Sequence, residues 1–121
     1  MAVKLSSRQQ AQLAFLEPYG RQITAMNSLI EQMASPKADE QLGRTLLRQV
    51  SASKTQAQGL GLTRLADAMG AIEQTARRTG GGMSKLRTLR ELYQMLKINY
   101  EQALKVATTP NAHAEEEPAA P

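Results

Sequence analysis

Apolar side chains recur along this chain at intervals of three and four residues, which is the spacing of one face of an α-helix. The clearest run lies in the C-terminal third and consists of Leu86, Leu89, Tyr93, Leu96, Tyr100 and Ala103. No stretch alternates apolar and polar residues as a half-buried strand does. The pattern therefore predicts an all-α protein.

Further helical stretches precede this run. A short N-terminal helix is expected to begin at Ser6 or Ser7, because a serine followed three residues later by glutamine is typical of a capping box. Pro18 and Gly20 should interrupt or kink this helix. Further helices are predicted over residues 21–33, over residues 38–58 and from about residue 63. Thr63 is expected to cap the helix that begins there. The inward faces are expected to carry Ile23, Met26, Ile30 and Met33; Leu42, Leu46, Val50, Ser53 and Ala57; and Leu65, Met69, Ile72 and Ala76. The core-filling methionines are expected to be Met26, Met33, Met69 and Met95.

Glycine marks the joints between these stretches. Gly59-Leu60-Gly61 predicts a helix stop with a tight turn, and Gly80-Gly81-Gly82 predicts a loop. Short joints between amphipathic helices favour an antiparallel up-down four-helix bundle, with the short N-terminal helix added, over residues 1–108. The apolar pattern then stops, and residues 109–121 are expected to form a disordered tail rich in Ala, Pro and Glu.

The composition narrows the classes of function. The chain has no cysteine, so it has no disulfide framework and no thiolate metal site, which fits a cytoplasmic location. No apolar run approaches the roughly 20 residues that span a bilayer, and the first residues do not resemble a signal peptide. The single histidine, His113, lies in the tail, and one histidine cannot form a typical zinc site. No metal and no cofactor are therefore expected.

The charge is unevenly distributed. The formal net charge is +4. Because negative charge is concentrated in the tail, at Glu115, Glu116 and Glu117, the net positive charge of the part before the tail is higher than that of the whole chain. A basic body favours an acidic partner or a phosphate backbone, although the charge can also serve solubility alone. A second basic group lies beside the glycine loop and consists of Arg77, Arg78, Lys85, Arg87 and Arg90. No recognised DNA-binding motif accompanies it.

The most specific pattern lies between Ser51 and Leu65. Lys54 follows Ser51 by three residues, and Leu60-Gly61 comes before Leu65. In this spacing the segment resembles the signature of histidine-phosphotransfer (HPt) domains, which runs roughly His-x-x-Lys-Gly-x-x-x-x-Leu-Gly-x-x-x-Leu. Ser51 stands where the family has its phosphoryl-carrying histidine, and Thr55 stands where it has the following glycine.

The resemblance implies a four-helix module of two-component signalling that has lost its phosphoacceptor. The similarity to the family extends to residues 42–48, which come before the signature. It also includes the next expected helix, residues 65–77, with Ile72-Glu73 near its end. In HPt domains the surface around the histidine is an exposed apolar patch with the lysine nearby, and a receiver domain presents an acidic pocket to it. The chain is therefore expected to bind a response-regulator receiver domain or a histidine kinase without carrying phosphate, as an adaptor, inhibitor or scaffold.

The expected contact surface lies on one helix. Residues separated by three, four and seven positions share a helix face, and the partner-binding residues are predicted to be Arg44, Leu47, Arg48, Ser51, Lys54 and Thr55. Ser51 is expected to be exposed. Catalysis is not expected, because a serine nucleophile needs a base and no carboxylate is spaced to lie beside Ser51 on its own helix. Three alternative interpretations stay open. The basic helix face can be solvated without a partner, the chain can be a basic helical protein that binds nucleic acid or an anionic surface such as a membrane, or it can be a subunit of a helical assembly.

Overall fold

The protein is described from a computed structural model, which covers residues 5–34, 40–78 and 82–110. Within these ranges the chain forms α1 (Ser7–Gln32), α2 (Glu40–Gly59), α3 (Thr63–Arg77) and α4 (Gly82–Thr108). The prediction of an all-helical protein is confirmed for this part of the chain. The predicted tail falls almost wholly outside the described residues, so its disorder stays a prediction.

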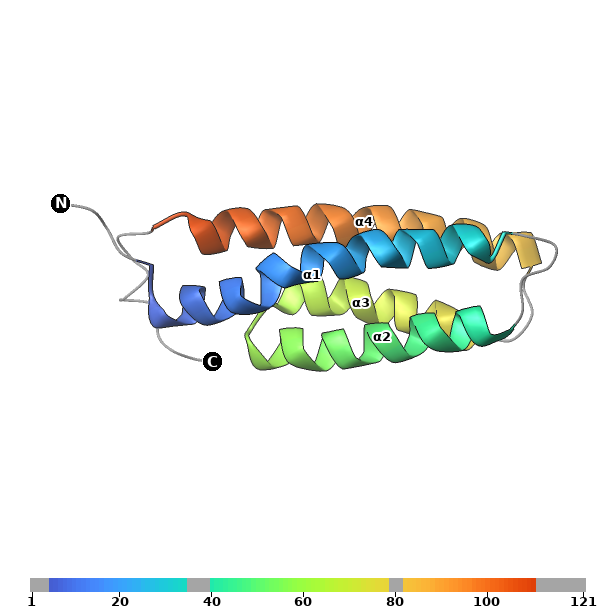
Figure 1. The fold of residues 1–121 in the computed structure, drawn as a ribbon, viewed down its shortest axis with the longest axis horizontal. Coiled ribbons are helices and arrows are strands. Elements are labelled where there is room, and N and C mark those ends of the chain that lie inside the picture. The colour runs from blue at the N-terminus through green and yellow to red at the C-terminus, as the bar shows by residue number, and fades with distance from the viewer. Residues whose placement is uncertain (1–4, 35–39, 79–81, 111–121) are drawn as a thin grey trace.

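The four helices pack against one another around a shared core. α2 packs against α3, α3 packs against α4, and α1 packs against both α4 and α2. In Figure 1 the helices lie along a common direction, and each begins near the point where the preceding one stops. The backbones of α2 and α4 do not approach each other anywhere in the described ranges. These two helices therefore lie on opposite sides of the core.

The core is built largely from the predicted apolar stripes. The side chains with essentially no exposure include Leu16, Met26, Ile30, Leu46, Val50, Leu65, Met69, Ile72, Leu89 and Leu96. Burying one such side chain contributes about 2 kcal/mol, so these stripes supply the main force that holds the helices together. Met95 is an exception, because it is 56% exposed, and its prediction as a core residue is wrong.

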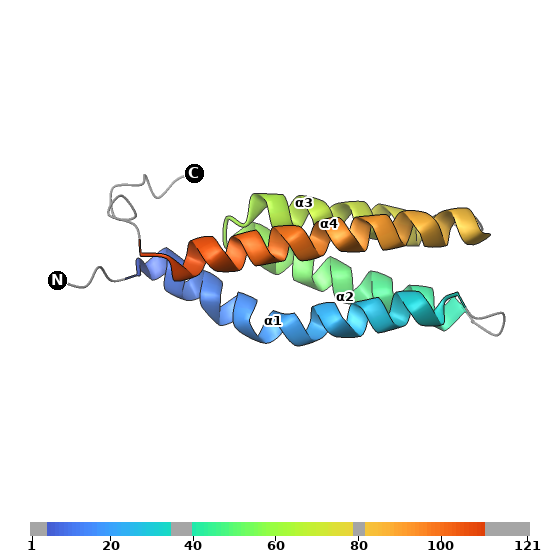
Figure 2. The same cartoon turned by 90° about the horizontal axis from the view of Figure 1, so that it is seen from above.

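α1 is one helix, so the expected separate N-terminal helix is wrong. Pro18 lies inside it, and Figure 2 shows α1 bending part-way along its length. The hydroxyl of Tyr100 on α4 donates a 2.7 Å hydrogen bond to the carbonyl of Leu16. It also lies close to Gly20, where a Cβ atom would come within 3.1 Å of the hydroxyl oxygen. A proline and a side chain inserted beside it kink a helix without ending it.

The start of α1 agrees with the predicted capping box. The Ser6 side chain accepts from the Gln9 backbone N–H, and the Gln9 side chain accepts from the Ser6 N–H. The side-chain nitrogen of Gln9, Nε2, also donates to the backbone carbonyls of Val106 and Thr109 at the end of α4. One glutamine therefore satisfies backbone groups at two helix ends and ties them together.

The turn between α2 and α3 forms where glycine predicts it. Gly61 has a φ of +75°, a conformation that glycine adopts without steric cost. The N–H of Leu62 donates to the carbonyl of Ala57 and the N–H of Gly61 donates to that of Gln58, which together form a Schellman motif. Thr63 is the first residue of α3 and does not cap it, because Leu62 occupies the N-cap without a side-chain hydrogen bond. The predicted Thr63 cap is therefore wrong.

Candidate functional site

The predicted partner-binding residues lie on α2, and two of them, Ser51 and Lys54, contact α3. Arg44, Arg48 and Thr55 are exposed, whereas Leu47, Ser51 and Lys54 are partly buried. Leu47 packs in part against the core. The expectation that Ser51 is exposed is therefore only partly correct, and the reason lies on α3.

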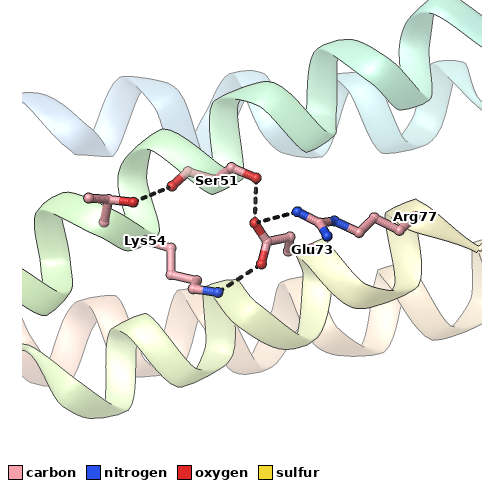
Figure 3. Close-up of polar contacts among 5 residues, drawn as sticks. Ser51, Lys54, Glu73 and Arg77 are labelled. Atoms are coloured by element: carbon pink, nitrogen blue, oxygen red, sulfur yellow. Dashed lines mark hydrogen bonds and ion pairs between the residues drawn. The ribbon is translucent and has the colours of Figure 1, made fainter.

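Glu73 of α3 organises this surface. Ser51 Oγ donates a hydrogen bond to Glu73 Oε2, and Lys54 Nζ donates one of 2.8 Å to Glu73 Oε1. Arg77, one turn further along α3, brings its guanidinium to 3.6 Å from Glu73 Oε2. Figure 3 shows side chains from two helices converging on this one carboxylate. We call Ser51, Lys54, Glu73 and Arg77 the Glu73 cluster.

Glu73 is buried as well as charged. The residue is only 5% exposed, and a buried carboxylate is tolerated when hydrogen bonds and opposite charges replace its hydration. The hydrogen bond from Lys54, followed by the one from Ser51, lowers the pKa of Glu73 below its usual value, although burial acts in the opposite direction. Glu73 is therefore ionised at neutral pH, and the cluster is a fixed ion pair with a hydroxyl attached.

Local geometry brings these groups together. Ser51 and Lys54 are three residues apart and so lie on adjacent turns of the same α2 face. The aliphatic stem of Lys54 passes over Gly70, where a Cβ atom would lie 3.7 Å from its Cδ, and its ammonium group then reaches Glu73. Thr55 turns away from the cluster, since its hydroxyl donates to the carbonyl of Ser51.

The arrangement places a carboxylate beside a serine hydroxyl, as a nucleophile and its base would be placed. A useful general base, however, has a pKa close to the working pH. Lys54 and Arg77 stabilise the ionised form of Glu73, which makes the carboxylate a weaker proton acceptor. The geometry therefore favours a structural role for this contact over catalysis at Ser51.

Glu73 was not identified from the sequence as a site residue, although a signal for it exists. Helix spacing identifies only a carboxylate on the same helix as Ser51, and Glu73 lies on the next one. It follows the buried Met69 by four residues and precedes the buried Ala76 by three, which places it near the inward face of α3. An acidic residue at such a position needs a cationic partner, and Lys54 is the nearby lysine of the signature.

The second basic group is largely occupied by contacts within the molecule. Lys85 Nζ donates to the carbonyls of Ala76 and Arg78 at the end of α3. Arg90 forms two hydrogen bonds with Glu31, of 3.0 and 2.9 Å, and Arg77 belongs to the Glu73 cluster. These contacts leave a smaller basic surface for nucleic acid than the sequence alone indicates.

Other kinds of site find little support in the described part of the chain. No three His, Cys, Asp or Glu residues there gather in a group that could hold a metal ion, and none of its helices is both long and apolar enough to cross a membrane. A groove between α1 and the end of α2 is lined by Phe15, Pro18, Tyr19, Gln22, Gln56, Leu60 and small residues. Its lining includes no charged side chain and no member of the Glu73 cluster. His113 lies outside the described residues.

Comparisons of the chain with protein-family models, with curated proteins and with solved structures find no match.

Proposed function

We propose that this chain is a pseudo-HPt signalling protein. Its four helices form an antiparallel up-down bundle, and the surface formed by α2 and α3 binds a receiver domain or a histidine kinase without carrying phosphate. The chain acts as an adaptor, inhibitor or scaffold in two-component signalling. The observation that carries this proposal is the residue at position 51 and its hydrogen bond to Glu73. The residue aligned with the phosphoacceptor histidine is a serine whose hydroxyl is bound to Glu73, beside the signature lysine.

The charge of this surface supports an acidic partner. Lys54 and Arg77 together outnumber the single negative charge of Glu73, and Arg44 and Arg48 extend the positive surface along α2. A receiver domain presents an acidic pocket, so the two surfaces are complementary, which favours rapid and specific association. The partly exposed Leu47 adds an apolar contact beside the charges.

The same cluster gives the reason why we do not expect this surface to carry a phosphoryl group. A serine offers no imidazole nitrogen to accept the phosphoryl group. Lys54, which in the family lies near the phosphoryl group, is held here by a 2.8 Å hydrogen bond to Glu73. The surface keeps the positions needed for recognition and has lost the group needed for chemistry.

The test is a calorimetric titration of the chain with purified receiver domains and histidine kinases from its own organism. Arg48→Glu reverses an exposed charge on the proposed surface, and Arg21→Glu makes the same change at an exposed position on α1. We expect Arg48→Glu to weaken binding by about tenfold or more and Arg21→Glu to change it little. Leu47 is a poorer probe, because it also packs on the core and a charge there would lower stability.

Two outcomes would overturn the proposal. One is that none of the receivers or kinases binds. The other is that both charge reversals weaken binding equally, which would indicate a non-specific response to net charge. Binding to unrelated DNA sequences that falls steeply with salt would support the nucleic-acid alternative instead.

A further inference from the structure

The outer face of α4 carries apolar side chains that the described structure does not cover. Every large hydrophobic side chain that is strongly exposed in the described ranges lies on this helix: Met83 at 68%, Met95 at 56%, Ile98 at 57% and Val106 at 64%. A single exposed apolar residue needs no explanation, but a group of them on one face marks an interaction site.

Three of these residues share one stripe. Met95, Ile98, Gln102 and Val106 follow each other at three, four and four residues, so they lie along one side of α4. All four are exposed, and none is charged. We call this set the α4 stripe. Met83 lies off the stripe, near the start of the helix.

Two charged residues lie at equal distances on either side of Ile98, and the exposed Glu101 lies at the edge of the same face between Ile98 and Lys105. Glu91 precedes Ile98 by seven residues and Lys105 follows it by seven, so both lie two turns away on the same side of the helix, about 10 Å from Ile98 along the axis. Both are exposed. Neither side chain forms an ion pair with the described residues, in contrast to Glu31 and Arg90, which pair with each other.

We propose that the α4 stripe binds a second copy of this chain, with the two α4 helices antiparallel. The three positions spaced by seven residues, Glu91, Ile98 and Lys105, are complementary to themselves only when the copy is reversed. With Ile98 near the two-fold axis, Glu91 lies level with Lys105 of the partner subunit, and this pairing occurs twice. A parallel copy would instead place Glu91 against the same residue of its partner. A closed two-fold dimer uses the same surface on both subunits, as this arrangement does.

The dimer would leave the proposed docking surface open. α2 lies across the core from α4, so self-association through α4 does not cover Arg48, Ser51 or Lys54. A dimer would then present two docking surfaces facing away from each other, as a scaffold requires. Self-association itself does not depend on the HPt proposal, and the experiment below measures it without any partner protein.

Sedimentation velocity of the full chain, from micromolar to millimolar concentration, tests the proposal. We expect the wild type to form a dimer and Ile98→Asp to raise its dissociation constant by about tenfold or more, because the charge enters the centre of the contact. Asn27→Asp adds the same charge at an exposed position on α1 and should leave the dissociation constant unchanged. A wild type that stays monomeric throughout, or a dimer that Ile98→Asp does not weaken, would overturn the proposal.

A charge exchange tests the antiparallel direction separately. Glu91→Lys and Lys105→Glu should each weaken the dimer, because each places like charges opposite one another. The double variant should restore the wild-type dissociation constant, and circular dichroism of each variant checks that the helices are intact. If the single variants weaken the dimer and the double variant does not restore it, the antiparallel pairing is wrong.

Discussion

The substitution Glu73→Gln tests whether the buried carboxylate holds α2 and α3 together. Glutamine has nearly the same shape, so the change removes the charge and leaves the packing intact. Its amide oxygen can still accept from Lys54, and the Ser51 hydroxyl can rotate to accept from the amide nitrogen. The variant therefore isolates the contribution of the negative charge.

The expected loss follows from the contacts of Glu73. The 2.8 Å hydrogen bond with Lys54 joins two charged groups, and the Lys54 side chain is only 28% exposed. Hydrogen bonds to charged groups contribute about 1.5–3 kcal/mol. Arg77 adds little, because its side chain is 58% exposed and lies 3.6 Å away, and such ion pairs contribute about 0.5 kcal/mol. Because glutamine still offers Lys54 a neutral acceptor, and a hydrogen bond to a neutral group contributes about 1 kcal/mol less, we expect Glu73→Gln to lower the free energy of unfolding by about 1 kcal/mol at pH 7.

The effect should depend on pH in a definite direction. The pKa of Glu73 is lower in the folded state than its ordinary value, so the unfolded state takes up a proton first as the pH falls. The stabilisation is fully present above the unfolded pKa of about 4.3 and disappears as the pH falls through the folded pKa. The difference between wild type and Glu73→Gln should therefore shrink below about pH 4.

Urea unfolding followed by circular dichroism, at neutral and acidic pH, measures this difference. Glu17→Gln, which removes a charge at an exposed position on α1, is the matched control and should have little effect. A loss below about 0.5 kcal/mol for Glu73→Gln at pH 7, or a loss that does not change with pH, would refute the electrostatic explanation.

Three further changes test the fold, each by urea or thermal unfolding. Gly61→Ala should lower the free energy of unfolding by about 1–2 kcal/mol, because alanine is strained at a φ of +75°. Gly59→Ala, with open space around the added Cβ atom, should be nearly neutral, and equal effects of the two changes would contradict the Schellman turn. Tyr100→Phe should cost about 1 kcal/mol by removing the hydrogen bond to Leu16, and an unchanged stability would argue against its role at the kink. Removing residues 111–121 should leave the melting temperature unchanged, since the described contacts of this end stop at Thr109; a large decrease would show that the tail packs on the helices.

Local features of the structure could be predicted from the sequence. The capping box depends on Ser6 and Gln9, which are close in the chain, and the turn at Gly61 depends on the conformational freedom of one residue. The apolar stripes also predicted most of the buried faces, because their spacing directly reflects helix geometry.

Features that depend on distant contacts were harder to predict. Pro18 normally favours the end of a helix, but α1 continues past it, and Tyr100 supports the kink from the far end of the chain. The partner of Ser51 was missed for the same reason, since Glu73 belongs to a different helix. The prediction that Met95 lies in the core rests on residue type alone, and it fails because Met95 is not part of the three-four spacing that contains Tyr93 and Leu96.

We propose that the surface formed by α2 and α3 binds a signalling partner. The most direct test of this proposal is a titration of the isotope-labelled chain with a receiver domain or histidine kinase from the same organism, followed residue by residue through backbone amide NMR signals. The proposal predicts that the perturbed signals cluster around Arg48, Ser51 and Thr55, while those of the outer face of α4 stay unchanged by the partner. Perturbations confined to other surfaces, or no perturbation by any such partner, would contradict it.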